Sequence, residues 1–579
     1  MPNCFGIHFF NSTQNNEKIY NKMKKYIILV FATFTFSNLY CQCSEWQKII
    51  ESKQYQIWSG KQSVVIGNNG NIYKVFKFFD TINIDGFSLY GDSGGFLNWN
   101  NMGILGINSI TKKVFFVNYT KSKSRYNEYP RIAYNDYSKE IVVCGYTNDS
   151  ALQFDNKQVT KNELFYVYLS KFDTLGKCNF IIKPITVNDS NSYIGYATNT
   201  VCDKMGNIYI SGFYTGVINI SGKAYSTVPG FSKYFLAKFD NNGNNIWVND
   251  TINSDFIQNK DITIDDNGNI YSAIDFGDKL KYNSDSIKNK SPFGGTDVAI
   301  IKFDSTGKII WVTAGGDIGS DYVYGCTVDK NFNVYACGNF AGSFKIQGKQ
   351  IYGGSSSAYV FSLDSKGKLR WIKPLVDSVD ATSFSIQVLD NNKIICTTNF
   401  SSQLQIDNVI LNSKVVDNSG YPNTAYFIMD DLGNIFKYSQ MGSKVGSGSN
   451  VYVSNKDIYI EGGFISDINL DTTKYIFTDT IPKSFLWKLC EDKLLGVDKY
   501  EINLRKSFLI YPNPASSAFT IEHATQQKED LTIYNTLGEL VYKDTWPRGQ
   551  TLRNIDMSAL PKGIYIIRIG DAVQKVVRE

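Results

Sequence analysis

One stretch decides the fold of this chain: Asp203–Val248, DKMGNIYISGFYTGVINISGKAYSTVPGFSKYFLAKFDNNGNNIWV. It holds four short apolar runs separated by Gly, Asn and Asp, which tolerate the positive φ angles of tight turns. The runs are Asn207–Phe213, Gly216–Ile220, Tyr234–Phe239 and Asn245–Val248. We predict that they form one antiparallel sheet of four strands. Because the sheet has apolar side chains on both faces, it needs neighbouring copies to cover them.

Copies of the first run recur about every 60–70 residues along the chain. Their first apolar residues are Ile72, Ile141, Ile208, Ile270, Val334, Ile394 and Ile458. Fixed-period repeats of four-stranded sheets are typical of β-propellers, in which each sheet is a blade. The sequence therefore predicts an all-β fold with a seven-bladed propeller.

The last hairpin of the stretch also recurs, with Asp, then Gly three residues later, then Trp four residues further on. The copies are Asp240, Gly243 and Trp247; Asp304, Gly307 and Trp311; and Asp364, Gly367 and Trp371. Asp and Gly suit the turn, and we predict that each Trp wedges between neighbouring blades as a large apolar plug. Asp-rich loops can also bind calcium, which stays open as an alternative, although the spacing differs from an EF-hand loop.

Composition narrows the function. The 579 residues carry a net charge of +5 with no basic run beyond the N-terminus, which gives no reason to expect a nucleic acid partner. The two histidines, His8 and His523, both lie outside the repeats. A propeller without histidine has no Ser-His dyad and no His-ligated zinc. Catalysis there would depend on carboxylates, Lys, Tyr or a cofactor.

The N-terminal region predicts export. Lys24 and Lys25 precede the apolar run Tyr26–Phe36, which is too short to span a membrane. We predict a signal peptide over residues 23–41 and interpret residues 1–22 as an over-long extension. Lipidation of Cys41 is the alternative. No transmembrane span is expected in the mature protein.

The two ends of the repeat region are predicted to meet. The last repeat supplies three strands, ending with Ser484–Cys490, and Glu45–Ile50 resembles the missing fourth strand. We therefore predict a propeller over residues 42–490, closed by its N-terminal strand, which removes the open edges. Cys43 and Cys490 would flank the closing hairpin loop, within disulfide reach. We assign no partners to the remaining repeat cysteines, Cys144, Cys178, Cys202, Cys326, Cys337 and Cys396.

The segments GNIYISGFYTG and FLAKFDNNGNNIWV resemble the SBBP-type β-propeller repeats of large bacterial exported proteins, over residues 44–490. Asp304–Trp311 also resembles the tryptophan-docking repeat of pyrroloquinoline quinone dehydrogenases. That second resemblance implies, as an alternative, a quinone and calcium in the central channel.

A linker, residues 491–507, precedes short alternating strands that predict a small β-sandwich over residues 508–579. Its three motifs are Tyr511-Pro512-Asn513-Pro514, Ile533–Gly538 and Leu560-Pro561-Lys562-Gly563-Ile564-Tyr565. They resemble the type A C-terminal sorting domain of type IX secretion cargo. The resemblance implies docking on an outer-membrane translocon and removal by a sortase-like peptidase. The mature protein would then be extracellular or on the cell surface.

We assign no catalytic, cofactor or metal residue from the sequence. The first hypothesis is a non-catalytic binding or adhesion protein whose propeller loops contact a glycan or a protein. The alternative is a secreted hydrolase or lyase that uses carboxylates in the propeller channel, which requires two acids at a suitable distance.

Overall fold

The computed structural model describes residues 46–50, 62–78, 81–90, 101–120, 130–195, 199–291, 294–377, 380–389, 392–413, 421–454, 457–470, 473–476, 483–490, 508–523, 528–536, 538–570 and 572–579. The predicted signal peptide, residues 1–22 and Cys43 lie outside these ranges. The chain divides into two compact units, Met1–Leu494 and Leu495–Glu579.

Regular structure in the described ranges consists of β-strands without helices, as the sequence predicts. None of the described residues belongs to a helix long and apolar enough to cross a membrane.

The repeating element is an antiparallel sheet, seen most simply in β21 (Ile257–Ile264), β22 (Ile270–Phe276), β25 (Asp297–Phe303) and β26 (Ile309–Gly315). Every residue of β22 and β25 is buried. A strand buried along its whole length must be covered on both faces, and neighbouring sheets supply that cover.

The same four positions recur along the first unit. The first strands are β2 (Val64–Ile66), β8 (Arg131–Asn135), β15 (Asn199–Cys202), β21, β27 (Tyr322–Val328), β33 (Ala381–Val388) and the last residues of β38 (Ile435–Ser454). The second strands are β3 (Ile72–Phe78), β9 (Glu140–Thr147), β16 (Ile208–Thr215), β22, β28 (Val334–Phe340), β34 (Ile394–Phe400) and β39 (Asp457–Leu470). The third strands are β6 (Asn101–Ile107), β12 (Phe165–Phe172), β19 (Ser232–Phe239), β25, β31 (Ser357–Leu363), β37 (Tyr421–Met429) and β41 (Lys483–Cys490). The fourth strands are β7 (Val114–Thr120), β13 (Cys178–Val187), β20 (Asn245–Ser254), β26, β32 (Leu369–Asp377), the first residues of β38, and β1 (Trp46–Ile50). We call each such sheet a blade and name it after its first strand.

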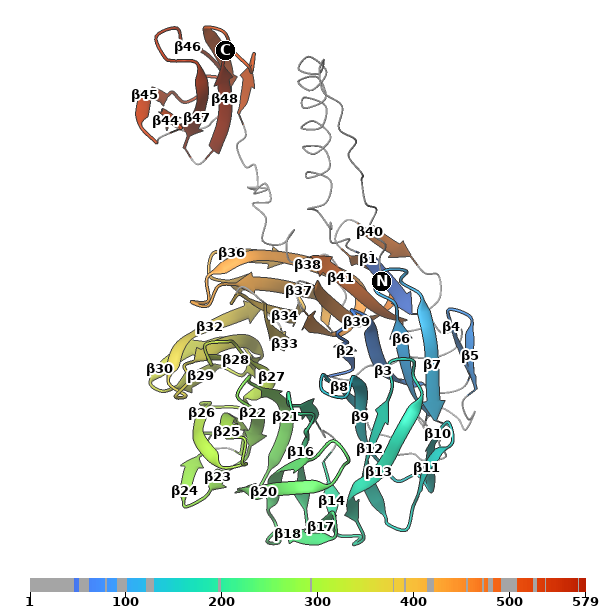
Figure 1. Cartoon of the computed structure of the whole chain (residues 1–579). Helices are drawn as coiled ribbons and strands as arrows, with labels where there is room; N and C mark the ends of the chain where they lie inside the picture. Colours follow the sequence, from blue (N-terminus) through green and yellow to red (C-terminus); the bar gives the residue numbers. More distant parts are fainter. Residues whose placement is uncertain are drawn as a thin grey trace, which may run out of the picture. The chain divides into compact units, whose positions relative to one another are not determined.

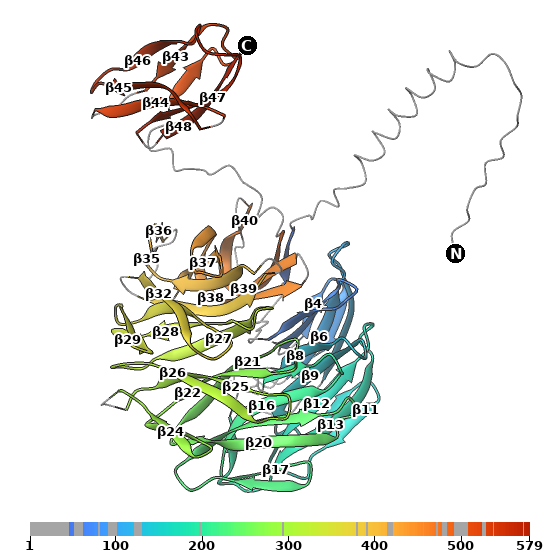
Figure 2. The same cartoon turned by 60° about the vertical axis from the view of Figure 1, so that its left-hand side comes forward.

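The blades are arranged as in a β-propeller, with their first strands around a common axis (Figures 1 and 2). Each first strand lies against the next, and β2 contacts β38, so the last blade meets the first. The N-terminal strand β1 pairs antiparallel with β41, with Trp46 opposite Lys488 and Ile50 opposite Ser484. This is the position that the sequence predicts for the N-terminal strand.

The strand assignment of the stretch Asp203–Val248 is wrong in one element. The run Gly216–Ile220 is not a strand of its own blade. It forms the hairpin β17 (Val217–Ile220) and β18 (Lys223–Ser226), which pairs with β13 of the preceding blade. The first strand of the blade is instead β15, upstream of the stretch. Alternation shows that a run is a strand, but it does not show which edge the strand joins.

Similar hairpins leave the blades between their second and third strands. They are β4 (Thr81–Ile84) with β5 (Phe87–Tyr90), β10 (Ala151–Phe154) with β11 (Lys157–Thr160), β23 (Lys279–Tyr282) with β24 (Asp285–Lys288), β29 (Ser343–Ile346) with β30 (Lys349–Tyr352), and β35 (Gln403–Ile406) with β36 (Val409–Asn412). The hairpins that begin with β17, β23, β29 and β35 each extend the fourth strand of the preceding blade. They therefore cover outer edges that would otherwise be open to pairing. Two short strands complete the unit: β14 (Tyr193–Ile194) pairs with β16, and β40 (Thr473–Ile476) pairs with β39.

The second unit is a small β-sandwich. One sheet contains β42 (Leu509–Tyr511), β43 (Ala518–Glu522) and β46 (Leu552–Asp556); the other contains β44 (Glu529–Asn535), β45 (Leu540–Trp546), β47 (Gly563–Ile569) and β48 (Ala572–Arg578). Alternate residues of both sheets face one core around the fully buried Trp546. The fold class predicted for this region is confirmed.

Candidate functional site

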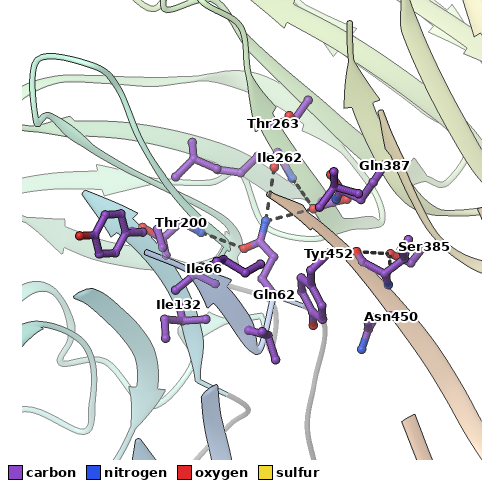
Figure 3. Close-up of a pocket in the computed structure, with 18 of the residues that line it drawn as sticks. Gln62, Ile66, Ile132, Thr200, Ile262, Thr263, Ser385, Gln387, Asn450 and Tyr452 are labelled. Atoms are coloured by element: carbon purple, nitrogen blue, oxygen red, sulfur yellow. Dashed lines mark hydrogen bonds between the residues drawn. The ribbon is translucent and has the colours of Figure 1, made fainter. Parts of the chain in front are cut away.

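A cavity of about 330 Å³ lies on the propeller axis and is lined by residues from all the first strands (Figure 3). Its polar lining consists largely of amide and hydroxyl side chains. They include Gln62, Thr200, Thr263, Ser385, Gln387 and Asn450. The rings of Tyr324 and Tyr452 and several aliphatic side chains complete the wall. Such a mixed wall suits a polar ligand that also has apolar faces.

Gln62 reaches from the start of β2 across this channel (Figure 3). Its Nε2 donates to Asp261 Oδ1 at 3.1 Å and to the carbonyl oxygen of Ile262 at 3.3 Å. Its Oε1 accepts a hydrogen bond from the backbone N–H of Thr200 at 3.3 Å. One side chain therefore connects the β2 blade to the β15 and β21 blades.

Asp261 supplies the only carboxylate among the described residues that line the channel. Besides the bond from Gln62, its Oδ1 accepts from the backbone N–H of Ile262 at 2.9 Å, and its Oδ2 from that of Cys326 at 3.0 Å. Asp261 therefore connects its own strand to Gln62 and to the neighbouring first strand β27. Glycoside hydrolysis of the usual kind needs two carboxyl groups on either side of the scissile bond, and the lining supplies one.

A buried polar network lies behind the channel wall at the joint between the β38 and β2 blades. Glu461 Oε2 accepts hydrogen bonds from Ser63 Oγ at 2.6 Å and from Tyr452 Oη at 3.2 Å. Its Oε1 forms an ion pair with Lys74, and both charged side chains are at most 1% exposed. Burial raises the pKa of Tyr452 to about 12, so its hydroxyl stays protonated and can donate at neutral pH.

The predicted Asp and Gly positions form turns on the fourth-strand hairpins. Asp240 Oδ1 accepts from the backbone N–H groups of Asn242 and Asn244, each at 2.8 Å. Asp304 and Asp364 make the equivalent pairs of bonds. The carboxylates are thus engaged by their own loops, which accounts for the motif as turn chemistry. Within the described ranges no three His, Cys, Asp or Glu side chains are grouped to hold a metal.

The three tryptophans of the motif lie between blades. The indole N–H groups of Trp247, Trp311 and Trp371 donate to carbonyl oxygens in the turn of the next blade, at 3.3, 3.1 and 2.8 Å. The acceptors belong to Ser305, Ser365 and Asp431. The turn glycine receives the ring: a Cβ at Gly307 would lie 2.8 Å from Trp247, and a Cβ at Gly367 would lie 2.8 Å from Trp311. Gly243 receives Phe180 in the same way.

The motif residues of the sandwich hold its strand ends. The peptide bonds before Pro512 and Pro514 are cis. Asn513 donates to the carbonyl oxygen of Lys575 at 2.7 Å and accepts from the N–H of Val577 at 2.9 Å, which ties it to β48.

Further motif residues shape the turns of the sandwich. The hydroxyl of Tyr565 donates to the carbonyl oxygen of Pro561 at 2.6 Å. Gly538 and Gly563 have positive φ angles, and Gly538 closes a turn with Asn535. Leu560 packs against the sandwich core. These contacts fix turns and strand ends within the sandwich.

The remaining repeat cysteines differ in exposure. Cys144, Cys178, Cys326, Cys337 and Cys396 are buried, whereas Cys202 is half-buried. Cys202 and Cys326 line the channel. Of the two cysteines predicted to form a disulfide, Cys490 is the last residue of β41, and Cys43 lies outside the described residues.

Sequence reasoning did not find the channel residues. Gln62, Asp261 and Gln387 precede or lie on first strands, whose short runs carry no repeated motif. The one available signal was position, since each lies just upstream of a recognised second strand.

Comparison with known proteins adds a family assignment for the second unit. Residues 509–579 match the family described as the secretion system C-terminal sorting domain. This confirms the sorting domain predicted from the three motifs, and with it export of the chain out of the cell.

A curated relative, an endo-acting ulvan lyase from Formosa agariphila, is 28% identical over 176 residues. The match covers 29% of this chain and 33% of the relative, so the chain spans about a third of that protein's length.

Solved structures give only distant matches. Puromycin hydrolase aligns with a TM-score of 0.38 at 8% identity, covering 82% of this chain and 62% of that chain. A Bombyx mori GH32 β-fructofuranosidase aligns with a TM-score of 0.25 at 11% identity, covering 78% and 86%. These similarities are too distant to indicate an activity for this chain.

Proposed function

We propose that this chain is an exported binding protein with a seven-bladed propeller whose axial channel holds a polar, uncharged ligand such as the end of a glycan. The chemistry of the channel wall carries the proposal. Amides and hydroxyls can donate and accept hydrogen bonds, and tyrosine rings offer flat apolar faces. The volume of about 330 Å³ lies at the lower end of the range of small-ligand pockets.

The export route supports this proposal. The signal peptide over residues 23–41 would deliver the chain to the periplasm, and the sorting domain would pass it to the type IX translocon. A sortase-like peptidase would then remove residues 508–579. The ligand would therefore be extracellular, and glycans are abundant there.

The test is a glycan array followed by calorimetric titration of each hit, using the mature chain. Gln387 lines the channel, so Gln387→Trp fills it and should weaken binding at least about tenfold. Lys349→Ala, on the exposed hairpin strand β30, is the control and should bind as the wild type does. An array without hits, or equal binding by Gln387→Trp, contradicts the proposal.

A second candidate is a secreted hydrolase or lyase with its site in the channel, and the similarity to an ulvan lyase favours it. A carboxylate mechanism would rest on Asp261, which would have to give up bonds to the channel wall. Incubation with ulvan and other uronic acid polysaccharides, followed by ultraviolet absorbance and reducing ends, tests this candidate. Product formation that Asp261→Asn abolishes would favour the enzyme; no product from any polysaccharide would favour the binding protein.

A further inference from the structure

Two buried aspartates lie where the β21 blade meets the chain that enters β27. Asp297 begins β25, and the strand register, in which Val298 lies opposite Gly315, places it opposite Gly316. A Cβ at Gly316 would lie 2.2 Å from Asp297 Oδ1. The carboxylate therefore lies directly against the backbone, and only glycine leaves room for it.

Asp321 is fixed beside the same segment. Its backbone N–H donates to the carbonyl oxygen of Thr296 at 2.7 Å, and Thr296 Oγ1 donates to the carbonyl oxygen of Asp321 at 3.0 Å. Its Oδ2 accepts from the backbone N–H of Asp317 at 3.0 Å. The Asp297 carboxylate thus adjoins Gly316, and the Asp321 carboxylate adjoins the next residue, Asp317.

Each of these carboxylates has one oxygen without a hydrogen-bond partner. Asp297 is 1% exposed and Asp321 is 0% exposed, and the unpartnered atom is Oδ1 in both. Burial raises the pKa of Asp297 to about 6 and that of Asp321 to about 8. A buried carboxylate needs a compensating charge or a proton.

Burial raises the pKa of Asp297 by more than the Lys290 ammonium group lowers it, so the neighbouring side chains supply only part of that charge. The ammonium group of Lys290 donates to two backbone carbonyl oxygens, at 3.0 and 3.2 Å. Asp317 adds a third carboxylate, whose Oδ2 accepts from Ser343 at 2.8 Å and from Gln350 at 2.7 Å. One ammonium group therefore accompanies three carboxylates.

We propose that Asp297 Oδ1 and Asp321 Oδ1 bind a divalent cation, Ca²⁺, with backbone carbonyl oxygens and water completing its coordination. Calcium prefers oxygen ligands, and extracellular calcium sites function at about 0.1–1 mM affinity. The ion would join β25 to the segment that enters β27 and so stabilise the joint between two blades. The site is separate from the Asp-x-x-Gly turns, whose carboxylates are engaged by their own loops.

Calorimetric unfolding of the mature chain in calcium and in EDTA tests the site. About 10 mM CaCl₂ should raise the wild-type Tm by about 1–2 °C. Asp297→Asn and Asp321→Asn should each abolish that rise. Asp285→Asn removes an exposed carboxylate from the hairpin strand β24 and should keep the rise. Loss of the rise in both Asp297→Asn and Asp321→Asn, together with its retention in Asp285→Asn, supports the proposal.

Direct calcium titration of the wild type gives an answer even where a variant fails to fold, since the proposal requires bound calcium that EDTA removes. No binding, or a Tm rise that survives both substitutions, overturns it. In a third outcome, Asp297 and Asp321 share a proton instead of binding a cation. Because the pKa values are raised by folding, stability would then fall as pH rises from about 4 to 8, without any calcium effect, and the proposal would be overturned.

Discussion

The β15, β21, β27 and β33 blades are joined by an indole seated on the turn of the next blade, whereas the β38 and β2 blades are joined by buried charge. At the first kind of joint a Trp donates to a turn carbonyl and covers a turn glycine. At the second, Lys74 pairs with Glu461 in a fully buried site, and Lys48 pairs with Asp85, which is 33% exposed, at 2.6 Å.

This difference follows from how the two joints arise. Neighbouring repeats can share one contact that several copies encode, so the motif is visible as a spacing. The closing joint occurs once and brings together the two ends of the repeat region, so its residues follow no period. Substitutions at one repeated joint should therefore lower the free energy of unfolding only slightly. Substitutions at the closing joint should lower it more.

The largest effect is expected from the proposed disulfide between Cys43 and Cys490. The pairing of β1 with β41 brings the two chain segments together. In the chain-entropy model a bridge that closes so long a loop contributes about 4–5 kcal/mol. Cys490→Ser should lower the free energy of unfolding by that amount in urea titrations. Reductant should do the same to the wild type and nothing further to the variant. Peptide mapping that finds both thiols free would contradict the bridge.

Breaking the buried ion pair should cost slightly less. Glu461→Ala leaves Lys74, whose pKa burial already lowers to about 7, without its carboxylate in a fully buried site, which costs about 3–5 kcal/mol. The double variant Lys74→Met and Glu461→Leu removes both charges and should recover most of the loss. Urea unfolding of the three proteins separates these outcomes. If the double variant is no more stable than Glu461→Ala, the hydrogen bonds of Glu461 to Ser63 and Tyr452 also stabilise this joint.

Gly307 and Gly268 provide a matched pair for the repeated joint. Both have positive φ angles, of 87° and 78°. A Cβ at Gly307 would meet Trp247 at 2.8 Å, whereas at Gly268 the nearest atom lies at 3.6 Å. Gly268→Ala should therefore cost about 1 kcal/mol from backbone strain alone. Gly307→Ala should cost about 2–3 kcal/mol, because the ring must also move. If the two variants unfold at the same temperature, the contact between Gly307 and Trp247 does not contribute to the joint.

The smallest effect is expected from the indole hydrogen bond. Trp311→Phe keeps an aromatic ring against Gly367 but removes the donor to Ser365, which should cost about 1 kcal/mol. The β8 blade already carries Phe180 at this position, seated on Gly243. A loss above about 2 kcal/mol would mean that ring volume, rather than the hydrogen bond, dominates the joint.

Much of the fold could be predicted from the sequence. The spacing of Asp, Gly and Trp indicated the turns and the position of the indoles, since both depend on residues within one repeat. The pairing of β1 with β41 could be inferred because the last repeat was one strand short. The hairpin of β17 and β18 was assigned to the wrong sheet, because its partner edge lies in another repeat.

The candidate site was less predictable. Gln62 and Asp261 meet across the channel although they belong to different blades, and neither is part of a repeated motif. Asp297 and Asp321 likewise come together only through strand register and a loop. Contacts of this kind depend on three-dimensional closure of the ring, which residue spacing does not encode.

The pairing of the first strand with the last third strand has a consequence for how the molecule is made. Trp46 and Lys488 are almost the whole propeller apart in sequence, and such long-range contacts are slow to form. Until Ser484–Cys490 has emerged, β1 has no partner, and an unpaired strand edge invites aggregation. Shortening the chain at either end of the propeller should accordingly give insoluble protein.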